Sequence, residues 1–285
     1  MAVVLITGTS SGIGLLAAAR LAAAGHDVYA SMRSLAGSHD LAAELERRKT
    51  VAHLVQLDVT DVDSIARVLA SIEKEAGRLD VLINNAGYGL GGFFEDLSAA
   101  EIQAQFDTNF FGLQAVTRAA LPLMRQSAAG GSWGRIVNIS SVQGRIAVPG
   151  LGAYTASKFA LEGFSEGLYY ELQPFHIHVV LIEPGSYRTK IFTENARVAS
   201  RAANPHSPYA EYARWLRARM DKLLETSDLM GDAEDVARVI EIVLQKARPD
   251  LRYVVGRRAR QMLRLRKLLP GRLFHRMVLR RVSAP

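Results

Sequence analysis

The N-terminal stretch, residues 2–24, limits the possible folds of this chain more than any other part of the sequence. Residues 2–7, AVVLIT, are short, β-branched and uncharged, which predicts a buried parallel strand. The turn GTSSGIG follows, and an alanine-rich helical segment then runs over residues 15–24. Strand, glycine turn and helix in this order predict a dinucleotide site, because glycines let the backbone approach a pyrophosphate at the helix N-terminus.

Strand and helix patterns continue to alternate along the chain. Six strand–helix alternations are followed by a seventh strand at 251–255. This order predicts the α/β class, as a single-domain, doubly wound Rossmann fold whose seven-stranded parallel sheet carries helices on both faces. Ligands of such sheets bind at the carboxyl ends of the strands, where the glycine turn, residues 84–87, Ser141 and residues 184–189 all fall.

The segment SVQGRIAVPGLGAYTASK contains the residues best suited to proton transfer. Tyr154 and Lys158 are four residues apart in a helical pattern, so they share one face of a helix. A nearby ammonium favours the phenolate and lowers the phenol pKa, which brings it closer to the range useful for acid–base catalysis. Ser141, at the end of the strand-like run RIVNISS, could offer its hydroxyl to the same substrate oxygen.

The residue after the second strand bears on the choice of cofactor. An NAD site usually has an acid about twenty residues after the glycines, which binds the ribose 2′-hydroxyl. Here Met32 and Arg33 occupy that place, and an arginine pairs with a 2′-phosphate instead. The sequence therefore favours NADP(H) and leaves NAD(H) possible, while an ordinary solvent-facing arginine is the alternative reading. Asp58, which precedes Val59 at the end of a further strand, is expected to meet the adenine amino group.

Composition excludes several other kinds of site. The chain has no cysteine, which rules out disulfides, thiolate catalysis and cysteine-ligated metals, and its seven histidines show no metal-binding spacing. We therefore expect no metal. The sequence shows no membrane-spanning run and no signal peptide. The absence of cysteine fits a reducing, cytoplasmic setting, which is the expected location.

Positive charge is concentrated at the C-terminus. Eleven basic residues and no acidic residue follow Asp250, whereas the first 250 residues hold 24 basic and 28 acidic residues. We therefore separate residues 1–255, the dinucleotide-binding and catalytic domain, from a basic amphipathic tail at 256–285. In this tail arginines alternate with Leu, Met and Val, which predicts two short amphipathic helices separated by Pro270-Gly271.

Four interpretations of the tail remain open. It could associate peripherally with an anionic membrane surface, pack against a partner subunit, or lie as a solvated basic helix on its own domain. Nucleic acid is disfavoured as a partner, because aromatic residues for base stacking are nearly absent from the tail.

Over residues 2–255 the sequence resembles the classical short-chain dehydrogenases/reductases. TGTSSGIG is similar to the glycine motif of that family, and NNAG is similar to its cofactor-facing motif. Ser141, Tyr154 and Lys158 match its catalytic core, and Asn109 matches its fourth catalytic member, although a buried mid-helix asparagine is more often structural. NNAGYG, YTASKFALEG and LIEPGSYRT most resemble the 17β-hydroxysteroid dehydrogenase-like branch.

The resemblance implies an NAD(P)-dependent oxidoreductase that interconverts a hydrophobic ketone or aldehyde and the matching alcohol. Tyr154 would be the general acid/base and Ser141 would polarise the carbonyl. Lys158 would hold the ribose hydroxyls and lower the tyrosine pKa, and Asn109 would position a water. Alternatives are a reductase of small ketones or acyl thioesters on the same scaffold, and a non-catalytic NADP-binding sensor or scaffold. The family also implies a homodimer or homotetramer formed through the helices at 99–126 and 151–174.

The resemblance also implies a substrate lid at residues 186–231 and further contact residues. The catalytic residues are Asn109, Ser141, Tyr154 and Lys158. The cofactor contacts expected are Gly8, Ser10, Ser11, Gly12, Ile13, Gly14, Arg33, Asp58, Val59, Asn85, Ala86, Gly87, Tyr154, Lys158, Pro184, Gly185 and Thr189. The substrate contacts expected, for a small apolar carbonyl or alcohol, are Ser141, Tyr88, Val148, Leu151, Tyr187, Phe192 and Trp215.

Overall fold

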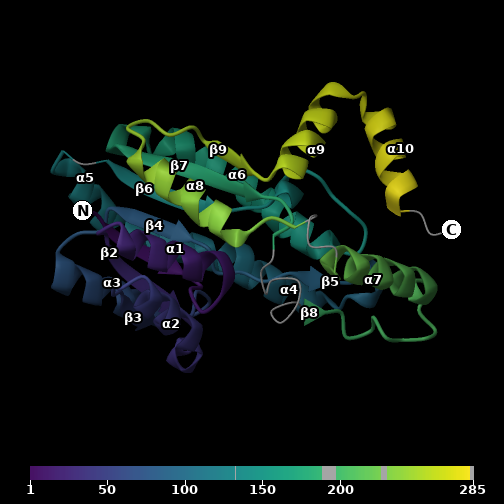
Figure 1. The fold of residues 1–285 in the computed structure, drawn as a ribbon, viewed down its shortest axis with the longest axis horizontal. Helices are drawn as coiled ribbons and strands as arrows, with labels where there is room; N and C mark the ends of the chain where they lie inside the picture. The colour runs from purple at the N-terminus through teal and green to yellow at the C-terminus, as the bar shows by residue number, and fades with distance from the viewer. Residues whose placement is uncertain (132, 188–196, 226–229, 283–285) are drawn as a thin grey trace.

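A single parallel sheet organises the computed structural model, which describes residues 1–131, 133–187, 197–225 and 230–282 (Figure 1). Within these residues, seven strands pair in the order β3-β2-β1-β4-β6-β7-β9, and every pair is parallel. The strands are β1 Val3–Thr7, β2 Asp27–Met32, β3 His53–Gln56, β4 Val81–Asn84, β6 Gly134–Ile139, β7 Ile177–Pro184 and β9 Arg252–Val255. The strand order reverses between β1 and β4, which opens a crevice at their carboxyl ends. The predicted doubly wound fold is confirmed.

Helices cover both faces of this sheet. Successive side chains along a strand point to opposite faces, so they pack against different sets of helices. Val4 and Ile6 of β1 pack with the helices α1, α2 and α8, whereas Val3 and Leu5 pack with α3, α5 and α6. Because both faces are covered, the whole of β1 is buried, which is why its sequence is a continuous apolar run. The helices are α1 Gly12–Ala23, α2 His39–Arg47, α8 Ala233–Gln245, α3 Val62–Ala76, α5 Leu113–Ala129 and α6 Gly152–Glu171.

The glycine turn between β1 and α1 depends on backbone conformations that other residues rarely adopt. Gly8 and Gly12 have φ angles of 72° and 61°. Gly14 is required for a different reason, since a Cβ there would collide with the side chain of Asn85 and with the carbonyl oxygen of Gly8. The turn therefore keeps the N-terminus of α1 close to the residues that follow β4.

The helix expected at residues 99–126 contains a change of winding. α4 spans Ala99–Phe106 and starts with a capping box between Ser98 and Glu101, and a π-helical segment, Asp107–Gly112, joins it to α5. π-helical turns are often found at functional sites because the extra residue displaces a side chain from the regular helix surface. Here the segment contains Asn109.

The remaining elements lie at the edges of the sheet. β5 Leu90–Gly91 pairs with β8 Arg197–Val198 in a separate two-stranded sheet, and Figure 1 shows both strands near α7 Ala210–Glu225 at one end of the main sheet. Short 3₁₀ helices occupy Leu35–Gly37, Phe94–Asp96, Val142–Gly144 and Gln173–Phe175.

The basic tail forms the two helices that the sequence predicts. α9 spans Arg257–Leu268 and α10 spans Gly271–Val282, and Figure 1 shows the pair standing off the body of the molecule. We call these two helices the arm. No helix in the described part of the chain is both long enough and apolar enough to cross a membrane.

Candidate active site

One cavity of about 400 Å³ lies at the carboxyl ends of the strands and collects most of the predicted site residues. It brings together segments that are more than 170 residues apart in the sequence, as expected where parallel strands end at one edge of a sheet. The predicted residues that line it are Gly8, Ser10, Ser11, Gly12, Ile13, Arg33, Asp58, Val59, Asn85, Ala86, Gly87, Tyr88, Ser141, Tyr154, Lys158, Pro184, Gly185 and Tyr187. Gly14 lies behind the turn, and Thr189 falls outside the described residues.

The end of the cavity beside α1 suits a pyrophosphate. Ser11 is the N-cap residue of α1 but makes no side-chain capping hydrogen bond, and the first turn contains no acid. Backbone N–H groups at such a helix start attract anions. Asn85 stabilises this turn by donating from Nδ2 to the carbonyl oxygens of Thr7 and Gly8, at 2.9 and 2.8 Å. Asn85 therefore holds the glycine turn in place and also lines the cavity.

Arg33 and Asp58 line the cavity beyond the glycine turn. Arg33 is exposed and follows directly after β2, so its guanidinium can reach a group bound at the cavity wall. Asp58 Oδ1 accepts hydrogen bonds from the backbone N and the hydroxyl of Thr60, at 2.9 and 2.7 Å, which fixes the carboxylate at the end of the segment after β3. The residues fit a dinucleotide, with a cation rather than an acid at the ribose end.

The three residues predicted for catalysis meet at the other end of the cavity. Ser141 follows β6, and its Oγ accepts a hydrogen bond from the Gln143 backbone N at 3.1 Å. Tyr154 lies in the first turn of α6 and is 3% exposed, and its phenol is hydrogen-bonded to the Ser141 hydroxyl. Lys158 lies one turn further along and donates from Nζ to the Ile139 carbonyl oxygen at 2.8 Å.

Burial sets the protonation states of this group. It raises the pKa of Tyr154 to about 12, although the hydrogen bond with Ser141 acts in the opposite direction. Burial lowers the pKa of Lys158 to about 8, although the Glu162 carboxylate acts to raise it. The expected net lowering of the tyrosine pKa is therefore not found, because burial outweighs the effect of Lys158, whose Nζ is bound to a carbonyl and lies 5.8 Å from the centre of the Tyr154 ring. A neutral phenol at pH 7 can serve as the acid of a carbonyl reduction.

Asn109, the fourth predicted catalytic residue, holds the backbone beside the cavity. Its Oδ1 accepts from the Tyr88 backbone N at 3.1 Å, and its Nδ2 donates to the Tyr88 carbonyl oxygen at 3.0 Å. Nδ2 also lies 3.4 Å from the hydroxyl oxygen of Ser157 on α6. The amide thus joins the loop after β4 to the catalytic helix, and the positioning of a water by Asn109 stays a prediction.

A buried ionic network that was not predicted from the sequence lies beneath the catalytic residues. Glu162 accepts from the Ser140 hydroxyl at 2.6 Å and from Arg252 Nε at 3.0 Å. Glu183, fully buried near the end of β7, lies 3.4 Å from Arg145 Nη1 and 3.5 Å from Arg252 Nε. Burial, together with the nearby Glu162 carboxylate, raises the pKa of Glu183 to about 7. The sign of this network in the sequence is Glu183, an acid inside the apolar run HVVLIEP.

Replacing Glu183 by glutamine is expected to stabilise the protein at pH 8 by about 1–2 kcal/mol, since ionising a buried carboxyl with imperfect partners costs free energy. The folded-state pKa is raised from 4.5 to about 7, so the stability of the unmodified protein falls as pH rises through this interval. The gain from Glu183→Gln should vanish below pH 4.5, where the carboxyl is protonated in both states. Urea unfolding at acid and alkaline pH measures the difference.

Exposed Glu46→Gln is the matched control for the loss of one charge. A Glu183→Gln variant that loses stability relative to the unmodified protein as pH rises would contradict the expected sign.

Two of the predicted substrate residues line the cavity in unexpected ways. The Tyr88 ring lies under the guanidinium of Arg197, with 4.5 Å between the guanidinium carbon and the ring centre. Arg197 itself lines the cavity and was not predicted, because nothing in its local sequence marks it. Tyr187 also borders the cavity, but its ring is buried in the core against Gly231 and Gly256. The expectation of a substrate-facing Tyr187 ring is corrected accordingly.

Three other predicted substrate residues lie outside this cavity. Val148 belongs to a separate groove beside the arm, because the loop after Ser141 turns outward and buries Ile146 against α9 and α10. Leu151 precedes α6 and forms a backbone bridge with Gly92. Trp215 lies on α7, packed against Tyr212 and under the Arg219 guanidinium. These three expectations are corrected.

Phe192 lies outside the described residues. In the described part of the expected lid, Tyr209 stacks on Phe93 with 4.7 Å between ring centres, which joins the segment before α7 to the loop after β5.

The doubly wound sheet, the glycine turn and the Ser141, Tyr154 and Lys158 set together define a dinucleotide-binding oxidoreductase. The chain belongs to the short chain dehydrogenase family, whose model matches residues 2–199. It is accordingly an NAD(P)-dependent oxidoreductase, and chains of the same fold have been solved with NADPH and with NAD.

Curated relatives and a solved structure support this membership over nearly the whole chain. A 3-ketodihydrosphingosine reductase from Bacteroides thetaiotaomicron is 39% identical over 89% of this chain and 87% of its own length. Bovine retinol dehydrogenase 8 is 38% identical over 94% of this chain and 86% of its own length. A short-chain dehydrogenase structure from Streptomyces avermitilis is 37% identical, covers 93% of this chain and 92% of its own, and superposes with a TM-score of 0.79.

Proposed function

We propose that this protein interconverts a hydrophobic ketone or aldehyde and the matching alcohol, with NADP(H) as its preferred cofactor. The observation that carries the proposal is the hydrogen-bonded pair of Ser141 and Tyr154 hydroxyls at one end of the cavity whose other end is the glycine turn. A carbonyl oxygen that enters this end replaces the contact between the two hydroxyls with one hydrogen bond to each.

The residues divide the proton chemistry among them. Ser141 donates a hydrogen bond to the carbonyl oxygen and polarises it, in the manner of an oxyanion hole. Tyr154 transfers its phenolic proton to the same oxygen, and the nearby Lys158 ammonium stabilises the phenolate that remains. The bound nicotinamide supplies the hydride, so the protein contributes position and electrostatic field. In the oxidative direction Tyr154 acts as the base.

Arg33 supports the preference for NADP(H), since it lines the cavity where an acid would otherwise bind the ribose. We expect Arg33→Ala to weaken NADPH binding about tenfold to a hundredfold, because a charge-assisted hydrogen bond to phosphate is worth about 1.5–3 kcal/mol. NADH, which lacks the 2′-phosphate, should bind almost as before. Fluorescence titration of both cofactors measures the two dissociation constants.

Arg67 is also exposed but does not line the cavity, so Arg67→Ala serves as the matched control. Equal losses for NADPH and NADH in Arg33→Ala would mean that Arg33 is an ordinary surface charge.

The names of two relatives support a hydrophobic substrate. One is named for a 3-keto sphingoid base and one for retinol, both of which carry their reacting group on a long apolar chain. A panel of bulky apolar ketones, small ketones and acyl thioesters, added to the NADPH complex, separates the proposal from the small-substrate alternative. Tight NADPH binding without turnover of any carbonyl would favour the alternative of a non-catalytic NADP-binding sensor or scaffold. Turnover of a steroid ketone would support placement in the 17β-hydroxysteroid dehydrogenase-like branch.

We also propose a homodimer or homotetramer, located in the cytoplasm. Large apolar side chains remain exposed where the family forms its subunit contacts, namely Phe111 just before α5 and Tyr170 near the end of α6. Light scattering on the purified protein tests the assembly, and cell fractionation tests the location.

A further inference from the structure

The arm has an unusual concentration of exposed leucines. In the part of the chain that the structure describes, five leucines are exposed, and four of them lie in the arm. Leu268 is 78% exposed and Leu273 is 51% exposed, and these two flank the turn at Leu269-Pro270. Figure 1 shows this turn at the outer limit of the arm, away from the sheet. Exposed leucines on a turn that projects from the body are typical of a surface that meets an apolar partner.

Positive charge surrounds these leucines. Arg264, Lys267 and Arg272 are exposed in the same part of the arm, and no acidic residue follows Asp250 anywhere in the sequence. The arm is therefore both apolar and cationic at its outer turn. That combination matches a surface with an apolar interior and an anionic exterior.

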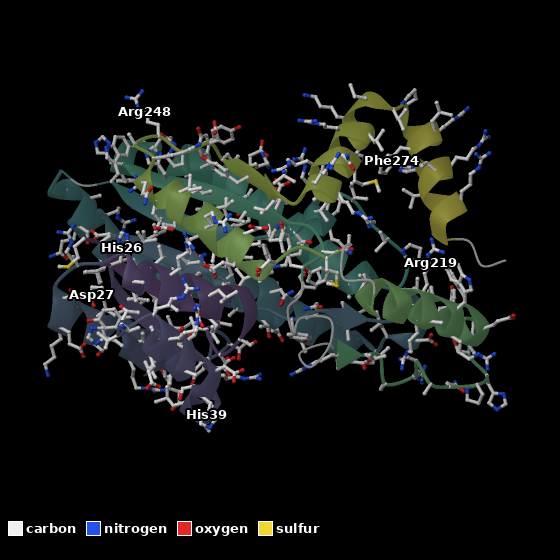
Figure 2. All side chains as sticks on the ribbon, viewed as in Figure 1. His26, Asp27, His39, Arg219, Arg248 and Phe274 are labelled. Atoms are coloured by element: carbon white, nitrogen blue, oxygen red, sulfur yellow. The ribbon has the colours of Figure 1, made fainter. Side chains whose placement is uncertain are left out.

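The arm is fixed to the body by a small apolar core. Leu263 and Phe274 are buried against Ile146, and the Arg266 guanidinium covers the Phe274 ring at 5.0 Å from its centre. Figure 2 shows Phe274 on the side of α10 that faces α9. Because this core holds the two helices together, the leucines at the turn are not needed for packing within the arm.

A groove of about 570 Å³ runs between the arm and the body. Val148, Phe159 and Leu279 contribute to its apolar walls, and Arg266 and His275 are among its polar residues. An acyl chain fits such walls, and the Arg266 guanidinium offers a cation to an anionic headgroup.

We propose that the turn between α9 and α10 docks on an anionic lipid membrane, with Leu268 and Leu273 inserted among the acyl chains and Arg264, Lys267 and Arg272 at the headgroups. A second copy of the chain fits this surface less well, because a symmetric contact would bring two arms of the same charge together without an acid between them. Nucleic acid would satisfy the basic residues and leave the leucines in water. A membrane satisfies both, and the docking is independent of any particular substrate.

Co-sedimentation of the full-length protein with vesicles tests the proposal directly. Vesicles of phosphatidylcholine mixed with phosphatidylglycerol should carry the protein down, whereas pure phosphatidylcholine vesicles should not, and added salt should weaken the binding. Equal binding to both kinds of vesicle, or binding to neither, would overturn the proposal. Because no turnover is measured, the result does not depend on the proposed reaction.

Two pairs of substitutions separate the contributions of the leucines and of the charges. Leu268→Ser with Leu273→Ser should lower the partition coefficient by about tenfold or more. Lys267→Gln with Arg272→Gln should lower it roughly twenty-fivefold, at roughly fivefold for each basic residue near an anionic surface. Leu35→Ser, at a leucine that is 42% exposed outside the arm, is the control and should bind like the unmodified protein.

The alternative of a contact between copies has its own signature. Unchanged vesicle binding of the leucine pair would overturn the proposal, and so would a change in oligomeric state of that pair in the absence of lipid. All variants alter exposed side chains, and unchanged NADPH binding verifies that they remain folded.

Discussion

Tyr154→Phe is expected to lower kcat/KM for carbonyl reduction by about a hundredfold to ten-thousandfold, the usual contribution of a positioned general acid. The substitution removes one oxygen atom, which is hydrogen-bonded to Ser141 in a buried position. The ring remains in the first turn of α6, so the cavity keeps its shape. The affinity for NADPH should change little, because the glycine turn and Arg33 are not touched. Steady-state kinetics and a fluorescence titration measure the two quantities separately.

The same chemical change at an exposed tyrosine provides the control. Tyr170, on the same helix, is 64% exposed, and Tyr170→Phe keeps the ring that the proposed subunit contact would bury, so it should leave both turnover and binding unchanged. If Tyr154→Phe kept full turnover, the proton would have to come from another group and the proposed mechanism would be wrong. If it lost turnover together with NADPH binding, the cause would be a disrupted site rather than a missing acid.

The sequence was most informative where local backbone requirements determine the residue. Gly8 and Gly12 occupy left-handed conformations, and Gly14 leaves no space for a side chain, so the spacing of the turn in the sequence reports its shape directly. The apolar run of β1 likewise follows from burial on both faces of a parallel sheet. These constraints act within a few residues, which makes them readable without a structure.

Features that depend on contacts between distant segments could not be read in this way. Val148 and Trp215 were assigned to the substrate pocket from their position in the chain, but their directions depend on how the arm and α7 pack. The network that joins Glu162, Glu183 and Arg252 connects α6, β7 and β9, and no local spacing encodes it. Each residue of the network has an ordinary sequence neighbourhood, apart from the acid inside an apolar strand.

The pKa of Tyr154 is another property that depends on contacts between distant segments. The spacing of Tyr154 and Lys158 was interpreted as a tyrosine with a lowered pKa, because opposite charges favour ionisation. Desolvation has the opposite sign and the larger effect here, and it depends on the burial that the whole fold imposes. The identity of the pair was predictable from the sequence, whereas the direction of its pKa shift required the structure.

The pH dependence of reduction should report Lys158. Burial lowers its pKa to about 8, so the ammonium is present below that pH and is lost above it. Without this charge the phenolate that forms as Tyr154 gives up its proton is less stable, and kcat/KM for reduction should fall as pH rises through about 8. The measurement is kcat/KM against pH, which reflects ionisations of the free enzyme.

Two substitutions at Lys158 test this assignment. Lys158→Met removes the charge at every pH, so kcat/KM should be about a hundredfold lower below pH 8 and should no longer decline near that value. Lys158→Arg keeps a charge that is not lost in this range, because a guanidinium deprotonates only at far higher pH. Its activity should therefore persist above pH 8, where the unmodified enzyme declines. A decline near pH 8 in both variants would assign the ionisation to another group, and Glu183, whose pKa burial raises to about 7, would be the first to examine.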